Sequence, residues 1–551
     1  MTRALMEGFM GEMPILSPGT LKPNQASETY DVKIEGGNLK SLREDLFVAA
    51  KTTASPLLSL YLYNSQWFEW ETDVDAVKSQ IGADAYDRVL FTGDGAPKVT
   101  YSAIATSGGQ PFPSNSYLLG TPPPGYVSGS FPFGQALTGN VTGTPDDVND
   151  LVDTRFYVAT SVDIFGAEGP PCLVSPAFEW QPGQTVNIDI PSAPVGNYNI
   201  TGWRLYRTST GSASTDFLYV KEGSTWSAST ADTPAAEQHS EGLTTEDYNL
   251  PHPSMIGITA MPGSFLAGHY DNILFFSEPG YPHAWPIAYQ LNTKKPIVGI
   301  EVVAQNMLLV ATEDRPYIAI GTDPANMSLS SLDDILQACV SKRSILDVGS
   351  SVVYASPDGL MSVSTKGSVL VTESVFSADQ WEAMNPASME CHLYEGVAMV
   401  VWENYTAGTQ GAFFINPAVP EAGIVRLSGR PDGSYHDALT DRLYISIGGD
   451  IKVFDGDTTY RTGTWTSKLM EFLSPLRFSC GRAWGNEVGN VMVSMLDKTN
   501  EYFSRVVRGE NPFRLKGGQK FRSARAKLTL SGGAEIHRLE LAETMPELRG
   551  S

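Results

Sequence analysis

The chain has 551 residues, a net charge of −23 at pH 7, and 42% hydrophobic and 10% aromatic residues. This composition can fill a packed core, which excludes an intrinsically disordered chain, and the lack of any run of 18 apolar residues excludes a transmembrane helix. The acidic residues and glycines among the first twenty positions predict no secretory signal, and we expect no direct membrane insertion. With 52 glycines and 36 prolines between short apolar runs, the sequence indicates many tight turns and an all-β protein.

The charge is distributed unevenly along the chain. Residues 462–551 carry 14 Lys and Arg against 9 Asp and Glu, whereas the rest of the chain is strongly acidic. The stretch 505–527 holds eight basic residues, interleaved with Phe503, Phe513 and Phe521. Such a stretch can contact nucleic-acid phosphates, or it can be the solvated face of a sheet whose phenylalanines form the core. An acidic body with a basic end suits a component of an assembly that docks on partners of different charge.

The first part of the chain, residues 1–55, predicts an N-terminal segment that ends in a strand leading into the next domain. Residues 56–105 contain two strand-like runs, PLLSLYLYNSQWFEWETD and DRVLFTGDG, and predict a strand–turn–strand unit. Helical periodicity is scarce, and short helices are predicted at 73–80 and 328–336. Residues 106–150 are rich in Gly, Pro, Ser and Thr and predict an extended loop.

Residues 151–250 predict a separate β-sandwich of the fibronectin type. Four strand-like runs alternate with turn residues over a length that suits such a domain, and Trp203 is a candidate for its buried tryptophan. The run YNITGWRLYRTS directs Ile200, Trp203 and Leu205 inward and predicts a bulge at Gly202.

A repeat follows in residues 251–461. Five segments share one form, an apolar strand, a polar turn and a second strand: 265–280, 306–324, 351–367, 396–417 and 441–457. The steps between equivalent apolar positions are 42, 44, 46 and 45 residues, for Leu266, Leu308, Val352, Ala398 and Leu443. A period in the forties with several strands predicts β-propeller blades. With the unit at 56–105, the repeat predicts about six blades, followed by a basic C-terminal β region at 462–551.

No motif with the spacing of a catalytic or metal site occurs in the sequence. It contains no GxSxG, no phosphate-binding glycine loop, no HExxH and no CxxC, and its seven histidines lie far apart. The Asp-rich turn at 453–458 lacks the spacing of a calcium loop and uses Asp and Gly for backbone reasons. The four scattered cysteines are expected to be buried free thiols. We therefore expect no catalytic, cofactor-binding or metal-binding residues and no enzymatic activity.

The stretch FFSEPGYPHAWP at 275–286 has the composition of either an acid–base pocket or a stiff turn. Its two inner prolines cannot donate to a continuing strand ladder, and each proline holds the residue before it in extended geometry. Glu278 and His283 have no nucleophile near them in sequence, so a structural role is favoured, with Tyr281 and Trp285 laid on the neighbouring blade. The predicted structural corner consists of Glu278, Pro279, Tyr281, Pro282, His283 and Trp285.

Several segments together resemble one protein family. DNILFFSEPGYPHAWP resembles the Ser-Glu-Pro … Pro-His-Ala-Trp-Pro stretch of podovirus tail nozzle proteins, also called tail tubular protein B. The N-terminal run FMGEMPILSPGTLKPNQASETYDVKIEGGNLKSLRE, the segments DRVLFTGDGAPKVT and TRFYVATSVDIFGAEGPPCLVSP, and NPFRLKGG are also similar to that family. The segments span residues 9 to about 520 in the expected order, although the chain is shorter than the longest nozzle proteins.

The resemblance implies a structural virion protein of a short-tailed bacteriophage. Members of the family form a six-fold ring below the portal–adaptor complex, which makes the distal tail tube for genome ejection. We therefore expect a homohexamer, assembled in the host cytoplasm and located in the virion tail. The expected partners are the tail adaptor (head-to-tail connector) protein, tail fibre or tailspike proteins, and genomic DNA in transit without sequence specificity. Loops such as 106–150 are candidates for gating or subunit contact.

A different function remains open for the same architecture, namely a β-propeller protein that binds or degrades glycans. It would need carboxylates and aromatic side chains at the mouth of the propeller, and their separation cannot be predicted from the sequence.

Overall fold

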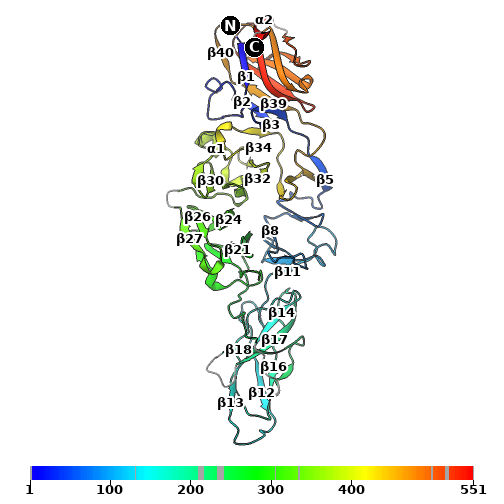
Figure 1. The fold of residues 1–551 in the computed structure, drawn as a ribbon, viewed down its shortest axis with the longest axis vertical. Helices are drawn as coiled ribbons and strands as arrows, with labels where there is room; N and C mark the ends of the chain where they lie inside the picture. Colours follow the sequence, from blue (N-terminus) through cyan, green and yellow to red (C-terminus); the bar gives the residue numbers. More distant parts are fainter. Residues whose placement is uncertain are drawn as a thin grey trace. The chain divides into compact units, whose positions relative to one another are not determined.

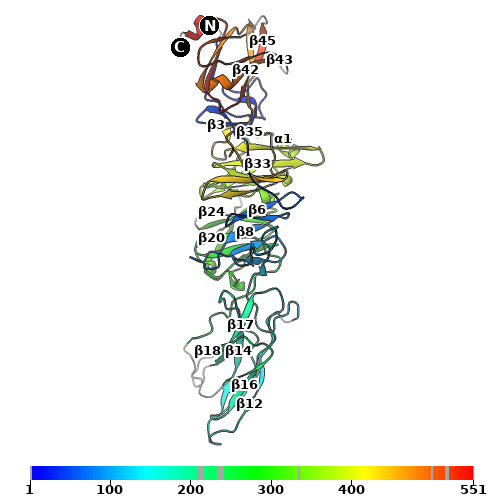
Figure 2. The ribbon, with the colours of Figure 1, turned by 90° about the vertical axis from the view of Figure 1, so that its right-hand side faces the viewer.

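The structure is a computed structural model and describes residues 3–130, 132–208, 216–232, 241–304, 306–332, 336–497, 500–515 and 520–549. In these ranges the chain is nearly all β, with many small sheets (Figures 1 and 2). The predicted all-β class is therefore confirmed at this level. No helix among the described residues has the length and hydropathy needed to cross a membrane.

The N-terminal part and the following small sheet contain eleven strands. These are β1 (Arg3–Glu7), β2 (Ala26–Tyr30), β3 (Val32–Glu35), β4 (Asn38–Ser41), β5 (Leu46–Ala50), β6 (Ser59–Tyr63), β7 (Gln66–Trp70), β8 (Asp75–Lys78), β9 (Val89–Thr92), β10 (Lys98–Thr100) and β11 (Tyr117–Leu118). The next eight strands are β12 (Thr138–Thr142), β13 (Asp153–Arg155), β14 (Tyr157–Asp163), β15 (Phe178–Trp180), β16 (Thr185–Asp189), β17 (Ile200–Thr208), β18 (Phe217–Gly223) and β19 (Ser229–Asp232).

The repeat region contains nineteen strands and one short α-helix. These are β20 (Ile256–Met261), β21 (Phe265–Tyr270), β22 (Ile273–Phe276), β23 (Leu291–Asn292), β24 (Ile297–Ala304), β25 (Met307–Thr312), β26 (Tyr317–Ile320), β27 (Ser328–Ser331), β28 (Leu346–Asp347), β29 (Val352–Ala355), β30 (Leu360–Ser364), β31 (Gly367–Leu370), α1 (Ala378–Ala383), β32 (Glu390–Tyr394), β33 (Val397–Asn404), β34 (Thr409–Ile415), β35 (Val425–Leu427), β36 (Gly433–Asp437), β37 (Arg442–Ile447) and β38 (Asp450–Val453).

The C-terminal part continues with eight strands and a second short helix. These are β39 (Gly463–Ser467), β40 (Met470–Leu476), β41 (Cys480–Asn486), β42 (Val491–Asp497), β43 (Asn500–Val506), β44 (Phe513–Arg514), β45 (Phe521–Leu530), β46 (Glu535–Ala542) and α2 (Met545–Arg549). Short 3-10 helices lie at Ile287–Tyr289, Pro324–Asn326, Lys342–Ser344, Pro386–Ser388, Pro420–Ala422 and Val488–Asn490.

The predicted strand–turn–strand repeat is confirmed as a set of β-hairpins. Each of the five segments forms two neighbouring strands in the middle of a run of four: β21–β22, β25–β26, β29–β30, β33–β34 and β37–β38. The five positions taken as equivalent, from Leu266 to Leu443, are all buried. The inner strands are apolar because both of their faces are covered, which is why they stood out in the sequence.

The last of these sheets contains a strand from the N-terminal part of the chain. Its order is β36–β37–β38–β5, and Asp450 of β38 pairs with Ala50 of β5. A strand that comes about 400 residues earlier in the sequence therefore completes the final sheet of the repeat.

Three predictions about local structure were wrong. The segments predicted as helices contain strands β8 and β27, because tertiary pairing overrides a weak helical pattern. The segment 106–150 is not a loop throughout, because β11 pairs with β10 and β12 pairs with β16 of the insertion. Residues 56–105 form two separate sheets, β6–β7 and β8–β11.

The division of 56–105 follows from where its apolar side chains pack. Leu60 and Trp67 of the first hairpin join the core of Tyr444 and Ile451, whereas Leu90 of the second sheet joins another core. The inserted domain begins earlier than predicted, at β12, and its core surrounds the predicted Trp203. Its strands form the sheets β12–β16–β19 and β14–β17–β18 and the pair β13–β15. The bulge predicted at Gly202 is present as a register shift in the pairing of β14 with residues 200–202 of β17.

The two ends of the chain share one pair of sheets. β1 and β4 pair with β46, β2 pairs with β39, and their side chains belong to one hydrophobic core that includes Phe9 and Trp465. Strands β1 to β4 of the predicted N-terminal segment thus share sheets with the C-terminal β region, whereas β5 belongs to the repeat. Overall, the contacts group the chain into two compact units, one of residues 1–71, 309–317 and 331–551, and one of residues 72–308 and 318–330.

Candidate functional site

The corner that follows β22 consists of two successive turns. In the first, the N–H of Tyr281 donates to the carbonyl of Glu278 at 3.0 Å, with Pro279 and Gly280 at the centre. Gly280 has φ +76°, which with a preceding proline is typical of a type II turn. In the second, the N–H of Ala284 donates to the carbonyl of Tyr281 at 3.0 Å. Each proline occupies a position that needs no N–H donor, so the sequence stiffens the turn without an unpaired group.

The two aromatic rings of the corner differ in their surroundings. Trp285 is 2% exposed, and its indole N–H donates to the carbonyl of Pro282 at 3.0 Å. The Trp285 ring packs in a core with Leu90 and Val99 of the sheet β8–β11, as well as with side chains of β20–β22. Tyr281 is 49% exposed and contacts the rings of Tyr248 and His283. One ring therefore lies on the neighbouring sheet as expected, and the other does not.

Glu278 and His283 have different hydrogen-bond partners. The carboxylate of Glu278 accepts a hydrogen bond from the hydroxyl of Tyr289 at 2.8 Å. The Nε2–H of His283 donates to the backbone carbonyl of Glu168 at 3.0 Å. Because each side chain is occupied by a structural contact, this arrangement holds the corner together rather than positioning an acid–base pair.

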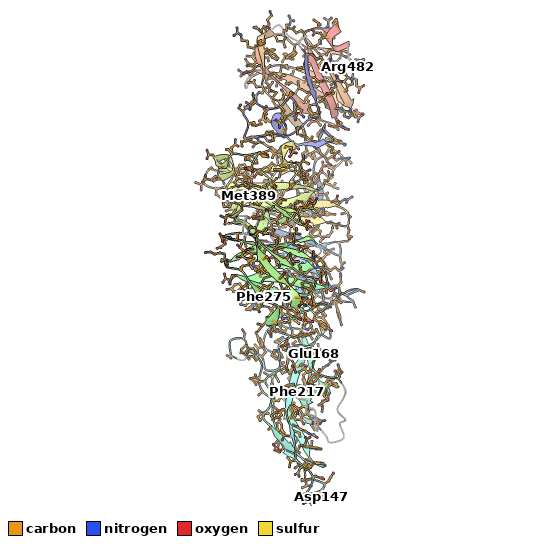
Figure 3. The ribbon with its side chains drawn as sticks, turned by 60° about the vertical axis from the view of Figure 1, so that its left-hand side comes forward. Asp147, Glu168, Phe217, Phe275, Met389 and Arg482 are labelled. Atoms are coloured by element: carbon orange, nitrogen blue, oxygen red, sulfur yellow. The ribbon has the colours of Figure 1, made fainter. Side chains whose placement is uncertain are left out.

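The partner of His283 belongs to the inserted domain. Glu168 follows β14, and its carboxylate accepts hydrogen bonds from Tyr206 at 2.6 Å and from Arg204 at 2.9 Å. Figure 3 labels Glu168 together with Phe275, which starts the corner sequence. The side chain of Glu168 thus binds strand β17, and its backbone carbonyl binds the corner. The sequence motif gives no sign of this contact, because the partners are more than 100 residues apart.

Three segments that carry the family resemblance meet at this junction. Arg88, in the segment 87–100, lies over the ring of Phe165, with the guanidinium carbon 4.6 Å from the ring centroid. Phe165 lies in the segment that contains Glu168, and its ring also contacts Tyr86 and Tyr101. Three of the five resemblance segments therefore take part in joining the inserted domain to the neighbouring sheets.

Burial shifts the protonation of two groups at the junction. Burial lowers the pKa of His283 to about 4, so this imidazole is neutral at pH 7. Burial raises the pKa of Asp163 to about 6, although its carboxylate accepts backbone N–H bonds from Phe165 and Ala167. As the pH falls, the lowered pKa of His283 reduces the stability of the fold, because burial opposes protonation of the imidazole. The raised pKa of Asp163 increases the stability, because burial favours the neutral carboxylic acid.

The free energy of unfolding of the His283→Gln variant is expected to fall less with acid than that of the wild type. Since the folded-state pKa of His283 lies below its ordinary 6.5, its stabilising contribution is complete above pH 6.5 and is lost as the pH falls toward 4. The wild type should therefore lose about 3 kcal/mol more than the variant between neutral pH and pH 4. Glutamine keeps an N–H donor for Glu168, and Asp163 contributes equally to both chains. Urea unfolding at several pH values measures the difference, and parallel stability curves would contradict it.

The other residues considered from the sequence have structural surroundings. The cysteines Cys172, Cys339, Cys391 and Cys480 are buried and free, as predicted. Among the described residues, no group of three or more His, Cys, Asp or Glu side chains is placed to hold a metal ion. In the basic stretch, Phe513 and Phe521 are buried in the core while Arg508, Arg514 and Arg522 are exposed. In strands β44 and β45 a buried phenylalanine is followed by an exposed arginine, as in a sheet with one solvated face.

No protein-family model matches this chain, and no curated protein matches it. One similar solved structure is a virginiamycin B lyase from Staphylococcus aureus, with 10% identity, a TM-score of 0.29, and coverage of 70% of this chain and 99% of that chain. Another is BBS1N in complex with ARL6DN, with 9% identity, a TM-score of 0.29, and coverage of 75% of this chain and 97% of that chain. A third is PorZ of Porphyromonas gingivalis, described as a surface component of the type IX secretion system, with 10% identity, a TM-score of 0.25, and coverage of 92% of this chain and 81% of that chain. None of these descriptions names a virion protein. At these TM-scores the similarities carry no statement about activity.

Proposed function

We propose that this chain is a subunit of the tail nozzle of a short-tailed bacteriophage, a structural protein of the tube through which the genome leaves the virion. The proposal rests first on the resemblance of ordered segments between residue 9 and about residue 520. It gains support from the junction at the corner, where three of the five segments that carry the resemblance pack against one another. The acidic composition also suits a channel, because a surface rich in basic residues would retain DNA.

The proposed subunit contains a β-propeller of six blades. Six runs of four consecutive or joined strands support this number: β8–β11, β20–β23, β24–β27, β28–β31, β32–β35, and β36–β38 with β5. The addition of β5 to the last sheet is the way in which a propeller closes its ring, by joining an early strand to the final blade. The domain between β11 and β20 is then an insertion between two blades.

The observation that carries the assembly part of the proposal is the exposed apolar edge strand β5. Strand β5 pairs with β38 on one side, and within the described part of the chain no strand pairs with its other side. Leu46, Phe47 and Val48 in this strand are all exposed, Phe47 to 58%. A free edge with three consecutive apolar side chains is a site of strand addition or association, which soluble monomers avoid. In a ring, the neighbouring subunit would cover it.

We expect Phe47→Lys to prevent ring formation without unfolding the subunit. A lysine on an exposed edge strand opposes association, since it would have to be desolvated in the interface. The purified chain, alone and mixed with a tail adaptor ring, would be measured by light scattering coupled to size exclusion and by electron microscopy. Leu439→Lys is the matched control, because Leu439 is 97% exposed in the turn between β36 and β37.

The expected result is a closed ring for the wild type and the control, and a folded monomer for the variant. A wild-type chain that stays monomeric and ignores the adaptor would argue against the nozzle. Binding or cleavage of glycans by that monomer would then favour the alternative function, a propeller protein acting on glycans.

A further inference from the structure

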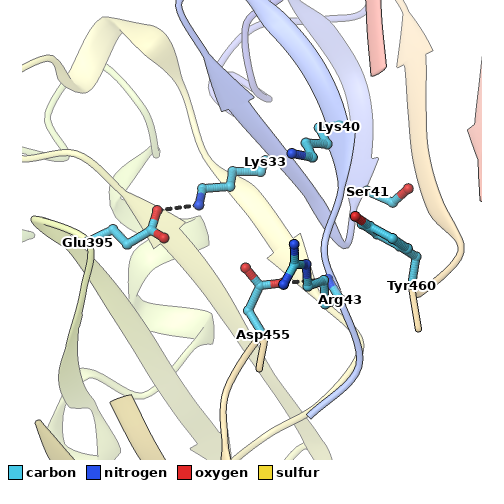
Figure 4. A pocket seen from close by; sticks show the side chains of 7 residues that line it. All are labelled: Lys33, Lys40, Ser41, Arg43, Glu395, Asp455 and Tyr460. Carbon is cyan, nitrogen blue, oxygen red and sulfur yellow. Dashed lines mark hydrogen bonds and ion pairs between the residues drawn. The ribbon is translucent and has the colours of Figure 1, made fainter. Parts of the chain in front are cut away.

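A cavity of about 270 Å³ lies beside the β3–β4 hairpin, the turn between β32 and β33, and the segment that follows β38 (Figure 4). Three cationic side chains line it, Lys33, Lys40 and Arg43. Lys33 and Lys40 are directly opposite each other in the register of the hairpin. Because like charges in opposed positions repel each other, such a pair requires counter-charge nearby.

The carboxylates of this cavity neutralise only part of that charge. Glu395 forms an ion pair with Lys33, which Figure 4 shows as a dashed line, and Glu35 outside the cavity forms a second one with Lys33 at 3.0 Å. Asp455 accepts hydrogen bonds from the hydroxyl of Tyr394 at 2.5 Å and from the backbone N–H of Arg43. Burial and the Asp455 charge raise the pKa of Tyr394, so this hydroxyl remains a donor. Both carboxylates are therefore engaged by the protein itself.

Two cationic groups of the cavity keep unused donors. Neither the ammonium of Lys40 nor the guanidinium of Arg43 forms a hydrogen bond or ion pair with another described residue. Lys40 lies opposite Glu535 in the neighbouring strand pair, and the pKa of that carboxyl is lowered first by hydrogen bonds from Asn486 and His537 and least by the charge of Lys40. Arg43 lies over the ring of Tyr460, with its guanidinium carbon 5.6 Å from the centroid, and this contact orients its planar group beside the cavity.

We propose that this cavity binds a phosphate group. Arg43 would supply two parallel N–H donors, Lys40 a point charge, and the Tyr460 hydroxyl a neutral hydrogen bond. Arginine and lysine together are the usual ligands of a tetrahedral oxyanion, and the volume suits a small anion more than a large organic ligand. The phosphate can come from free phosphate or from a nucleic-acid backbone, which share this chemistry. The inference does not depend on ring formation, because one chain contributes every residue.

The test is calorimetric titration of the full chain with inorganic phosphate, at constant ionic strength maintained with chloride. Lys40→Gln and Arg43→Gln are each expected to weaken binding about tenfold, since each removes a charge-assisted hydrogen bond. Tyr460→Phe should weaken it less, because it removes a neutral donor and keeps the ring under Arg43. Lys366→Gln, in the exposed turn between β30 and β31, is the control and should bind as the wild type does.

Thermal unfolding of each variant without phosphate shows whether the variant is folded, which separates a loss of binding from a loss of folding. A short single-stranded DNA without terminal phosphates distinguishes the two sources: competition with phosphate assigns a nucleic-acid backbone, and its absence assigns free phosphate. Equal binding of acetate, unchanged binding by the Lys40 and Arg43 variants, or no binding by the wild type would each overturn the proposal.

Discussion

Replacing Trp285 by alanine is expected to destabilise the unit that contains residues 72–308 by about 3–5 kcal/mol, the range measured for large buried aromatic side chains. The Trp285 ring is 2% exposed and packs with side chains of two sheets, so alanine leaves a cavity between them. The substitution also leaves the carbonyl of Pro282 without its indole donor at 3.0 Å. A domain of ordinary stability would lose a large fraction of its free energy of unfolding.

The matched control for this prediction lies four residues away. Tyr281 is a similar aromatic side chain in the same turn, but it is 49% exposed, so Tyr281→Ala should cost about 1 kcal/mol or less. Urea unfolding followed by tryptophan and far-ultraviolet signals would give the two values. Equal effects of the two substitutions would show that the ring of Trp285 does not carry the packing between the sheets.

The repeat could be read from the sequence because its signal is local. The inner strands of each sheet are apolar on both faces, and their turns carry Gly, Asp and Asn, so strand, turn and strand follow one another within about twenty residues. Leu308 and Val352 mark such strands, and both are buried as predicted. The outer strands, such as β28 with two residues, are too short to give a period.

The pairing of the chain ends could not be predicted in this way. Arg3 pairs with Ala542 and Ala26 with Ser467, and alternation of polar and apolar residues marks a strand without naming its partner. For the same reason the sequence predicts a loop over 106–150. Its strand β12 reads TGNVT, which is mostly exposed, and becomes a strand only through its partner β16.

The candidate site was predicted in part. The prolines and Gly280 of the corner determine a stiff turn from local geometry alone, and the structure has that turn. The role of His283 depends on Glu168, which lies 115 residues earlier in the chain and meets it only through the tertiary fold.

The second large effect is expected for Arg426→Met, which should cost about 3 kcal/mol because it leaves a buried carboxylate without its cation. Glu12 is 3% exposed, and its carboxylate accepts hydrogen bonds from the Arg426 guanidinium at 2.9 Å and from the backbone N–H of Thr29 at 2.5 Å. The pair fastens the N-terminal segment to β35, and just before this strand the N–H of Ile424 also donates to the carbonyl of Glu12.

The double variant Glu12→Gln with Arg426→Met distinguishes the lost charge pair from lost packing. Glutamine keeps an acceptor for Thr29 and removes the charge, so the double variant should recover most of the stability that Arg426→Met loses. If the double variant is as unstable as the single one, the arginine contributes through its packed methylene groups instead.

The pH dependence of the single variant provides an independent measure of the same charge. Burial raises the pKa of Glu12 even with Arg426 present, and removing the arginine raises it further. A carboxyl group whose pKa is higher in the folded than in the unfolded state binds its proton preferentially when folded, so stability rises as the pH falls through the raised value. The deficit of Arg426→Met relative to the wild type should therefore shrink between about pH 7 and about pH 5. The double variant has no carboxyl group at residue 12, so its stability should lack this component over the same range.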